Sequence, residues 1–295
     1  MTMKLNFFLS LFFLQVSLTA SDLRIFFTSS LNGYIKDCLC KAVPAPGLSK
    51  RHTLLQSLSF DRYKDILLET GDILDKGFIK PNKAFAIYES YTEIGYHLIT
   101  PGLHELKFRT QDLFKQPFSS YPLHSANIRI PNYFLSKPIG KEFVLLKRNK
   151  KVIGLLPLSS PKLLKLKLGK KYDSLKISEV EESILQVVEN NKADLWILVY
   201  YGTLKEASTL IDKLGNKFIM IVGSEKKKPS KGFYSLSLQK KPLYHLPGEG
   251  EYLGVLKFDS KSLRFKSGEI LQPDFDKTEH SSLVLKIMEK HSVKD

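Results

Sequence analysis

Residues 65–106 read DILLETGDILDKGFIKPNKAFAIYESYTEIGYHLITPGLHEL, and this stretch decides the fold class. Asp65–Glu69 predicts a buried strand that stops at the turn signal Thr70-Gly71-Asp72, since glycine and a short polar side chain end an apolar run. Residues 83–94 predict a helix, and Tyr96–Thr100 predicts a second strand that ends at Pro101-Gly102. A strand, a helix and another strand in succession form the repeating unit of an α/β fold.

The same alternation continues on both sides of this stretch. Strands are predicted at 23–28, 123–128, 143–146, 151–156, 195–200 and 218–222, and helices at 48–60, 178–191 and 205–214. After residue 222 the pattern favours antiparallel strands at 232–238, 241–246, 252–259 and 263–267, followed by a terminal helix at 279–290. Neither a repeat nor a long linker interrupts the pattern, so we expect one α/β domain of roughly 250 residues.

The first 20 residues have the pattern of an export signal. Lys4 precedes the mostly apolar run Leu5–Leu18, and small residues follow up to Ala20. At about 1.5 Å per residue the run spans roughly 21 Å, short of the roughly 30 Å bilayer core, which favours a signal cleaved after Ala20 over a retained anchor. We therefore expect a periplasmic or secreted mature protein without a transmembrane segment.

The chain is basic, with 45 Lys and Arg against 30 Asp and Glu and a formal net charge of +15. The surplus is spread over pairs and short runs such as Lys150–Lys151 and Lys226–Lys228. A nucleic-acid-binding protein more often concentrates its basic residues on one element with interleaved aromatic residues, so specific nucleic-acid binding is not expected. Solvated lysine-rich faces are the favoured interpretation, and an anionic surface or ligand is the alternative.

Two cysteines, Cys38 and Cys40, are separated by one residue. In an oxidising compartment such a pair predicts a disulfide, although so small a ring is strained and easily reduced. A soft-metal or redox site is the alternative interpretation. The spacing alone leaves both open.

Ligands of α/β sheets bind beyond the carboxyl ends of the strands. The polar residues that follow the predicted strands are therefore candidate site residues: Ser30, Asn32, Asp72, His104, Glu105, Tyr200, Tyr201, Ser224 and Glu225. A two-metal hydrolase needs several carboxylates and imidazoles at this edge to ionise a water. This set contains only one Asp, one His and two Glu.

Eight segments, in order, resemble motifs of one enzyme family. They are FTSSLNG (27–33), PGLSKRHTLL (46–55), LLETGD (67–72), GYHLITPGLHEL (95–106), SANI (125–128), KVIGL (151–155), ILVYYG (197–202) and IVGSEK (221–226). The chain thereby resembles the 5′-nucleotidase-type catalytic domain of the calcineurin-like metallophosphoesterase superfamily. Its Cys-x-Cys pair resembles that of an exported bacterial subgroup.

The resemblance implies an α/β four-layer sandwich in which two mixed β-sheets are flanked by helices. It implies a metallophosphoesterase-like domain over 21–262 after the signal peptide 1–20, and a C-terminal strand and helix extension over 263–295. The separate C-terminal domain on which family nucleotidases stack the base is not expected.

The same resemblance indicates that most metal ligands are replaced. Five ligand positions are degenerate: Ser30, Leu103, Tyr200, Ser224 and Lys226. Asp72 and the weak neutral donor Asn32 are remnant metal ligands, and His104 is a remnant catalytic residue. Since Ser, Leu and Tyr do little to offset the dehydration of divalent cations, and Lys repels them, a two-metal centre is not expected, although the residues allow a single divalent metal.

Three functions follow as hypotheses. The first is a non-catalytic exported binding protein whose partner is an anionic small molecule or an envelope protein. The second is a phosphoester (nucleotide) hydrolase with a reduced one-metal site made by Asp72, His104, Asn32 and Glu225. The third is redox or metal handling by Cys38 and Cys40. In the second, His104 alone contributes only about two to four orders of magnitude as a general acid.

Overall fold

The computed structural model describes residues 22–37, 46–77, 80–108, 118–131, 136–223, 242–246 and 250–293. The predicted signal peptide, the cysteine pair Cys38 and Cys40, and the site candidates Ser224, Glu225 and Lys226 lie outside the described residues. Within the described ranges, no helix combines the length and the apolar character needed to span a bilayer.

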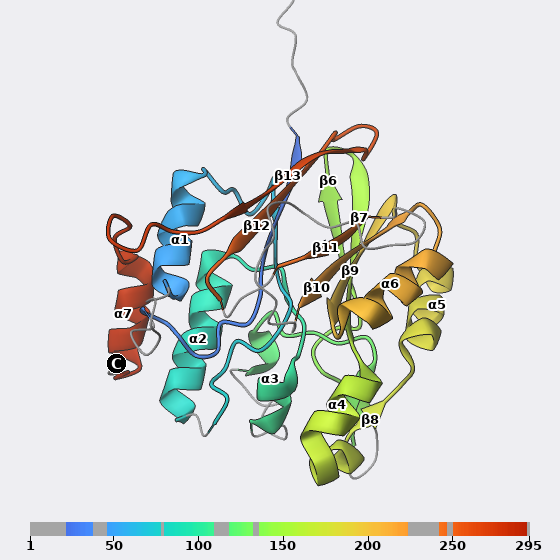
Figure 1. The fold of residues 1–295 in the computed structure, drawn as a ribbon, viewed down its shortest axis with the longest axis horizontal. Helices are drawn as coiled ribbons and strands as arrows, with labels where there is room; N and C mark the ends of the chain where they lie inside the picture. The colour runs from blue at the N-terminus through green and yellow to red at the C-terminus, as the bar shows by residue number, and fades with distance from the viewer. Residues whose placement is uncertain are drawn as a thin grey trace, which may run out of the picture.

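Two five-stranded mixed sheets form the centre of the molecule (Figure 1). The first has the order β13-β12-β1-β2-β3; its strands are β1 (Leu23–Thr28), β2 (Ile66–Glu69), β3 (Leu98–Ile99), β12 (Leu253–Phe258) and β13 (Phe265–Leu271). The second has the order β11-β10-β9-β7-β6; its strands are β6 (Val144–Arg148), β7 (Lys151–Ser159), β9 (Leu195–Tyr201), β10 (Phe218–Gly223) and β11 (Leu243–His245). In the first sheet β1, β2 and β3 run parallel, β12 runs antiparallel to β1, and β13 runs antiparallel to β12. In the second sheet β7, β9, β10 and β11 run parallel, and β6 runs antiparallel to β7.

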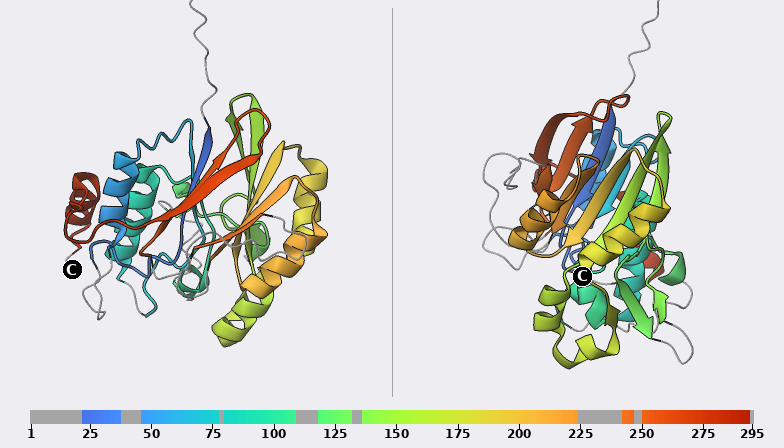
Figure 2. Two further views of the ribbon diagram at one scale, coloured as in Figure 1. Left: turned by 45° about the horizontal axis from the view of Figure 1, so that its top comes forward. Right: turned by 90° about the vertical axis from the view of Figure 1, so that its right-hand side faces the viewer.

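Helices cover the outer face of each sheet, as Figure 2 shows. The first sheet is covered by α1 (Leu48–Ser57), α2 (Pro81–Ile94) and α7 (Ser282–Lys290), and the second by α5 (Val180–Asn190) and α6 (Leu204–Lys213). The short helices α3 (Leu103–Lys107) and α4 (Pro161–Leu168) follow strand ends at the lower edge in Figure 1. A small third sheet joins β4 (Ile128–Pro131), β5 (Ser136–Pro138) and β8 (Lys176–Ile177).

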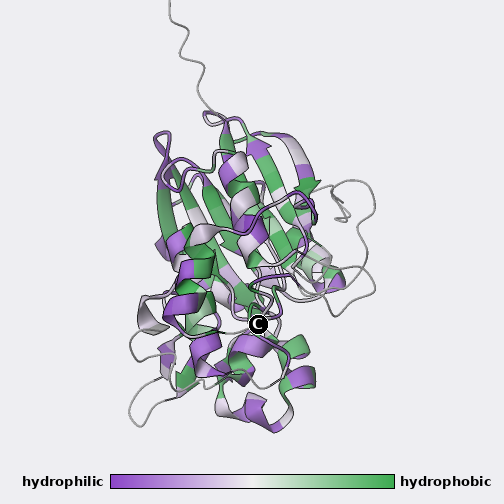
Figure 3. Ribbon diagram, turned by 90° about the vertical axis from the view of Figure 1, so that its left-hand side faces the viewer, coloured by the Kyte–Doolittle hydropathy of each residue, from purple (hydrophilic) through white to green (hydrophobic). Residues whose placement is uncertain are grey.

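Side chains along each strand point alternately to its two faces, so a separate hydrophobic core lies between each pair of adjacent layers. In β9, Ile197 and Val199 face the other sheet, while Trp196, Leu198 and Tyr200 face α5 and α6. Since successive strand side chains point to opposite faces, a strand buried on both sides must be apolar throughout. Figure 3 shows the strands mostly in hydrophobic colours. The predicted four-layer α/β sandwich is confirmed.

The terminal strand and helix are integral to these layers. β13 pairs with β12 along its length, from Leu253↔Leu271 to Phe258↔Phe265. The α7 helix begins at its cap Ser281, whose hydroxyl accepts the Val284 N–H, and it packs Val284, Ile287 and Met288 into the core beside α2. Residues 263–293 therefore complete the first sheet and its helical layer.

Several sequence predictions were wrong in detail. The stretch 123–128 is no continuous strand: Leu123 makes an isolated bridge to Ile99, and β4 begins only at Ile128. The strand at 243–245 runs parallel to β10, although an antiparallel strand was expected. The helices α3 and α4 were not predicted. The second of these begins with Pro161 behind its cap Ser160, a start signal that the sequence does contain.

Candidate functional site

Two loops meet at the carboxyl ends of β1 and β2. The Ser30 N–H donates to the Gly71 carbonyl (3.0 Å), and the Asn32 N–H donates to the Asp72 carbonyl (2.9 Å). Ser30, Asn32 and Asp72 all have left-handed backbone conformations, with φ of 53°, 52° and 58°. Non-glycine residues adopt this region at an energetic cost, and such residues cluster at functional sites. The loops therefore mark the candidate site.

The Asp72 carboxylate lies at the centre of this site and is bonded to other parts of the protein. Its Oδ1 accepts the backbone N–H of His104 (3.0 Å), and its Oδ2 accepts the hydroxyl of Tyr201 (2.8 Å). The His104 Nδ1 donates to the Leu74 carbonyl (2.9 Å) and lies 3.7 Å from the Asp72 Oδ1. Both side chains are largely buried. Thus the structure brings together the side chains of two of the three remnant residues that the sequence singled out.

A second carboxylate, that of Glu105, lies next to Asp72 and is fully buried. It accepts the backbone N–H groups of Gly102 (2.7 Å), Asp72 (2.9 Å) and Leu74 (3.1 Å). Burial first, and then the charge of Asp72, raise the pKa of Glu105 to about 8. The sequence predicts Glu105 as one of the polar residues at the strand ends but indicates no role for it. The structure shows it holding the Gly71–Leu74 loop to the start of α3.

Close backbone approach explains the glycine at position 102. A Cβ on Gly102 would lie 2.6 Å from both the backbone N and the Oδ1 of Asp72, and 2.8 Å from the Cε2 of Tyr201. Beside it, the Thr100 hydroxyl donates to the Val199 carbonyl (3.0 Å) and so connects the ends of β3 and β9 across the two sheets. These contacts fix Tyr201 against Asp72.

The structure places Tyr201 at Asp72, where the family resemblance had placed Tyr200. Tyr200 points to the opposite face of β9, and its hydroxyl is hydrogen-bonded to Ser160 and Glu206. A shift of one residue exchanges the two faces of a strand, so an alignment slip at this strand end selects the wrong tyrosine. Strand alternation was the signal that could have identified Tyr201, because Val199, two residues earlier, faces the other sheet.

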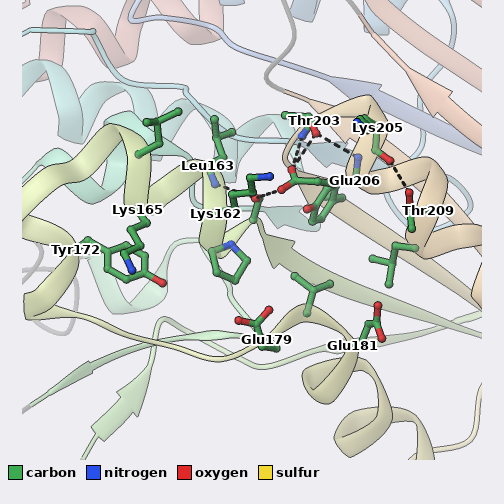
Figure 4. Close-up of a pocket in the computed structure, with 16 residues that line it drawn as sticks. Lys162, Leu163, Lys165, Tyr172, Glu179, Glu181, Thr203, Lys205, Glu206 and Thr209 are labelled. Carbon is green, nitrogen blue, oxygen red and sulfur yellow. Dashed lines mark hydrogen bonds between the residues drawn. The ribbon is translucent and has the colours of Figure 1, made fainter.

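Tyr200 belongs to a separate open groove of about 1060 Å³ between α4 and α6 (Figure 4). Lysines 162, 165 and 205 line it together with glutamates 179, 181 and 206, so its charges are mixed. Glu206 accepts the hydroxyls of Ser160 (3.1 Å) and Thr203 (2.9 Å) and thereby links the starts of the two helices. The groove and the Asp72 site lie on opposite faces of β9.

Behind the site lies a buried charged network. Glu69, three residues before Asp72, accepts the hydroxyls of Thr28 and Tyr91 (both 2.8 Å) and the Thr70 N–H (2.9 Å). The Arg51 Nη1 is 3.9 Å from Glu69, and the Arg51 Nη2 donates to Tyr91 (3.1 Å). Arg51 and Glu69 are both fully buried. Sequence reasoning treated them as parts of two family motifs and did not predict that they meet.

The described residues do not fit a two-metal centre. They contain no group of three or more His, Cys, Asp and Glu side chains placed to hold an ion. Asn32 turns its amide back to the Ser30 carbonyl (2.9 Å), and the Ser30 hydroxyl lies 3.2 Å from that of Ser29. Leu103 is apolar and packs against the core. Divalent cations bound by carboxylates and imidazoles need more donors than Asp72 and His104 provide.

Comparison with known proteins gives matches among solved structures only. No protein-family model matches the chain, and no curated protein matches it. The calcineurin-like phosphoesterase YfkN from Bacillus subtilis superimposes with a TM-score of 0.69 at 15% identity, covering 92% of this chain and 97% of that one.

Two larger proteins superimpose equally well. The 5′-nucleotidase precursor from Thermus thermophilus has a TM-score of 0.67 at 13% identity, covering 92% of this chain and 58% of that one. The sulfate thiohydrolase SoxB from the same species has a TM-score of 0.71 at 11% identity, covering 92% and 60%. The chain thus spans about three fifths of the length of these two proteins. At these identities the likeness establishes the fold alone: this chain is similar in fold to the calcineurin-like phosphoesterases and 5′-nucleotidases.

Proposed function

We propose that this protein is an exported, non-catalytic binding protein built on a metallophosphoesterase fold. One observation carries the proposal: both oxygens of Asp72, the surviving carboxylate of the candidate site, accept hydrogen bonds from the protein itself. The donors are the Tyr201 hydroxyl (2.8 Å) and the His104 N–H (3.0 Å). A carboxylate holds cations through its oxygen lone pairs, with one oxygen shared or both used, and the two hydrogen bonds occupy one lone pair on each oxygen of Asp72.

Tyr201 makes this arrangement hard to reverse. Burial first, and then the negative charge of Asp72, raise the pKa of Tyr201 well above its ordinary value. The phenol therefore stays protonated at neutral pH and acts as a hydrogen-bond donor to Asp72. It offers no anionic oxygen to a metal. Withdrawing it would leave a buried hydroxyl unpaired, at a cost of about 1–3 kcal/mol.

The chemical consequence concerns the attacking water. In two-metal hydrolases the ions lower the pKa of a bound water from 15.7 to about 7, which supplies hydroxide at neutral pH. The described donor set does not hold such a pair of ions. Binding is then the function that remains for this surface, and the basic chain favours an anionic small molecule or an acidic envelope protein as the partner.

A reduced hydrolase is the second candidate, and one observation favours it. The His104 Nδ1 lies 3.7 Å from the Asp72 Oδ1, so an imidazole and a carboxylate are still adjacent at the strand ends. In this alternative His104 acts as a general acid. Such a group contributes about two to four orders of magnitude to the rate, far less than a two-metal site.

A phosphatase screen separates the two candidates. The full chain is assayed with nucleotides, p-nitrophenyl phosphate and a phosphodiester in Mn²⁺, Zn²⁺, Ca²⁺ and chelator, beside a two-metal 5′-nucleotidase as the reference. We expect release of phosphate at the background rate, the same for wild type, His104→Ala and Asp72→Asn. Metal-dependent turnover that both substitutions abolish would contradict the proposal and establish the hydrolase.

A further inference from the structure

The end of the molecule opposite the Asp72 site is strongly basic. It consists of the strand starts and turns at the top of Figure 1, and we call it the basic end: residues 22–24, 61–65, 148–151, 192–194, 215–217 and 259–266. Hydrogen bonds connect these segments. The Arg148 Nη2 donates to the carbonyls of Arg62 (3.0 Å) and Asp65 (3.1 Å), and Asp194 accepts the Val152 N–H (2.8 Å).

The charge of the basic end exceeds what the composition alone would give. Of its 26 residues, 16 are charged, 11 basic and 5 acidic, whereas 25% of the whole chain is charged. The acidic residues are already neutralised: Asp65 pairs with Arg24 (2.6 Å), Asp61 with Lys64 (3.0 Å) and Asp194 with Lys151 (3.3 Å), and both Asp22 (2.5 Å) and Asp259 (3.7 Å) with Lys266.

Besides Arg62, five exposed basic side chains at this end make no ion pair with any described residue. They are Lys150, Lys192, Lys217, Lys261 and Arg264. They come from turns of both sheets, so together they present positive charge across the whole end. Because these exposed charges are not neutralised by a described carboxylate, they are available to an anionic partner.

Exposed aromatic side chains lie among these charges. Tyr63 is 79% exposed and Phe265 is 47% exposed, which makes them two of the five large hydrophobic residues exposed on the described surface. The Arg62 guanidinium lies 5.8 Å from the centre of the Tyr63 ring. Aromatic rings beside basic groups suit the boundary between lipid head groups and acyl chains, where one side is apolar and the other wet.

The predicted export signal is attached at this end of the molecule. β1 begins here at Leu23, only a few residues after the apolar run Leu5–Leu18. The four residues 19–22 span at most about 14 Å when fully extended. While the predicted signal is still attached and inserted in a bilayer, the basic end therefore lies close to the head groups; after cleavage, its charges alone would hold it there. The Debye length at physiological salt is about 8 Å, so part of this end feels the surface potential.

We propose that the basic end is a docking surface for anionic lipid bilayers. Each Lys or Arg near an anionic membrane surface strengthens partitioning by about fivefold. Five unpaired side chains on one end can therefore discriminate strongly between anionic and neutral lipid, even if only some of them reach the surface. Docked in this way, the protein holds its Asp72 site and the groove of Figure 4 away from the membrane.

A partition ratio tests this proposal on the full chain. Flotation is measured with phosphatidylcholine vesicles and with vesicles containing 30% phosphatidylglycerol, and the ratio removes the contribution of the apolar run, which is common to both. In 0.1 M NaCl we expect at least a tenfold preference for the anionic vesicles. The preference should collapse in 0.5 M NaCl, since salt screens the attraction.

Two variants with equal changes of charge locate the surface. Changing Lys150, Lys192, Lys217, Lys261 and Arg264 to Gln should reduce the preference to within about twofold of unity. The control changes Lys162, Lys165, Lys167, Lys170 and Lys205, exposed lysines of the α4 and α6 region, to Gln and should keep the preference. Equal losses in both variants would mean diffuse attraction by net charge and would overturn the proposal.

Lysine acetylation of the wild-type chain tests the same proposal without substitutions, so its result does not depend on whether the variants fold. Acetylation of Lys150 and Lys261, followed by mass spectrometry, should slow at least threefold when anionic vesicles are added, while acetylation of Lys165 should stay unchanged. If anionic vesicles slowed acetylation of all three lysines equally, or of none of them, the result would contradict docking. Tight binding of a single-stranded RNA oligomer together with no preference for anionic vesicles would also overturn the proposal and assign the basic end to nucleic acid.

Discussion

Replacing Glu69 by Ala is expected to lower the free energy of unfolding by about 3–5 kcal/mol, because it leaves the Arg51 guanidinium buried without a compensating charge. Both side chains are fully buried, and Glu69 also accepts the hydroxyls of Thr28 and Tyr91. Burial raises the pKa of Glu69, while Arg51 and the hydroxyl donors oppose that rise. The measurement is urea-induced unfolding at pH 7.

An exposed ion pair provides the control for this prediction. Glu181 and Lys213 are 2.6 Å apart, and their side chains are 57% and 56% exposed. Glu181→Ala should cost less than about 1 kcal/mol, as exposed pairs do. The double variant Arg51→Met with Glu69→Leu should cost less than Glu69→Ala, since no charge is then left unpaired. Equal costs for Glu69→Ala and Glu181→Ala would show that Arg51 and Glu69 do not interact as described.

Stability is expected to fall by about 1–2 kcal/mol between pH 6.5 and pH 8 because of Glu105. Its pKa is raised from 4.5 to about 8 by burial and by Asp72. In this window the unfolded chain has lost the Glu105 proton while the folded protein still holds it, so a rise in pH favours unfolding. Urea unfolding at half-unit intervals of pH measures the slope.

Other buried titratable groups also change stability with pH, and they determine which pH range and which control variant are used. Burial lowers the pKa of both His97 and His124 to about 4, so these residues make stability fall as the pH drops below about 6.5. The raised pKa of Glu69 has the same sign as that of Glu105. Glu105→Gln therefore isolates the contribution of Glu105: it should flatten the slope between pH 6.5 and 8. An unchanged slope in that variant would show that Glu105 does not titrate there.

The sequence predicted the fold well where hydrophobic periodicity is strong. Runs such as Leu195–Tyr200 and Phe218–Val222 are apolar at every position, and both are central strands buried on two faces. The predicted strand Leu23–Thr28 agrees residue for residue with β1. These elements are determined by local patterns, which is why a single sequence suffices to find them.

Contacts between distant segments decided the elements that were missed. Leu243–His245 is apolar enough for a strand, but its parallel pairing with β10 depends on how residues far apart along the chain meet. Likewise, Leu123 was expected to lie in a strand with Ile128, yet it bridges to Ile99 instead. Short segments have weak local preferences, so tertiary pairing sets their direction and register.

At the candidate site, the sequence identified the loops but misassigned one of the contacts. Asp72 and His104 do meet, at 3.7 Å between Nδ1 and Oδ1, as strand ends in α/β sheets suggest. The resemblance selected Tyr200, but the residue that contacts Asp72 is Tyr201. Side chains alternate between the two faces of β9, so only one of the two neighbouring tyrosines can point to Asp72. The roles of Glu105 and Arg51 are set by burial, which composition and spacing do not reveal.

The central claim is that the Asp72 carboxylate serves the fold and does not hold a pair of metal ions. The most direct test is the unfolding free energy of chelator-treated protein as a function of added Mn²⁺ or Zn²⁺. A metal that binds only the folded state stabilises it by about 4 kcal/mol at a concentration 1,000 times its dissociation constant. We predict no rise up to 1 mM of either ion, in wild type and Asp72→Asn alike. A metal-dependent rise that Asp72→Asn abolishes would contradict the claim.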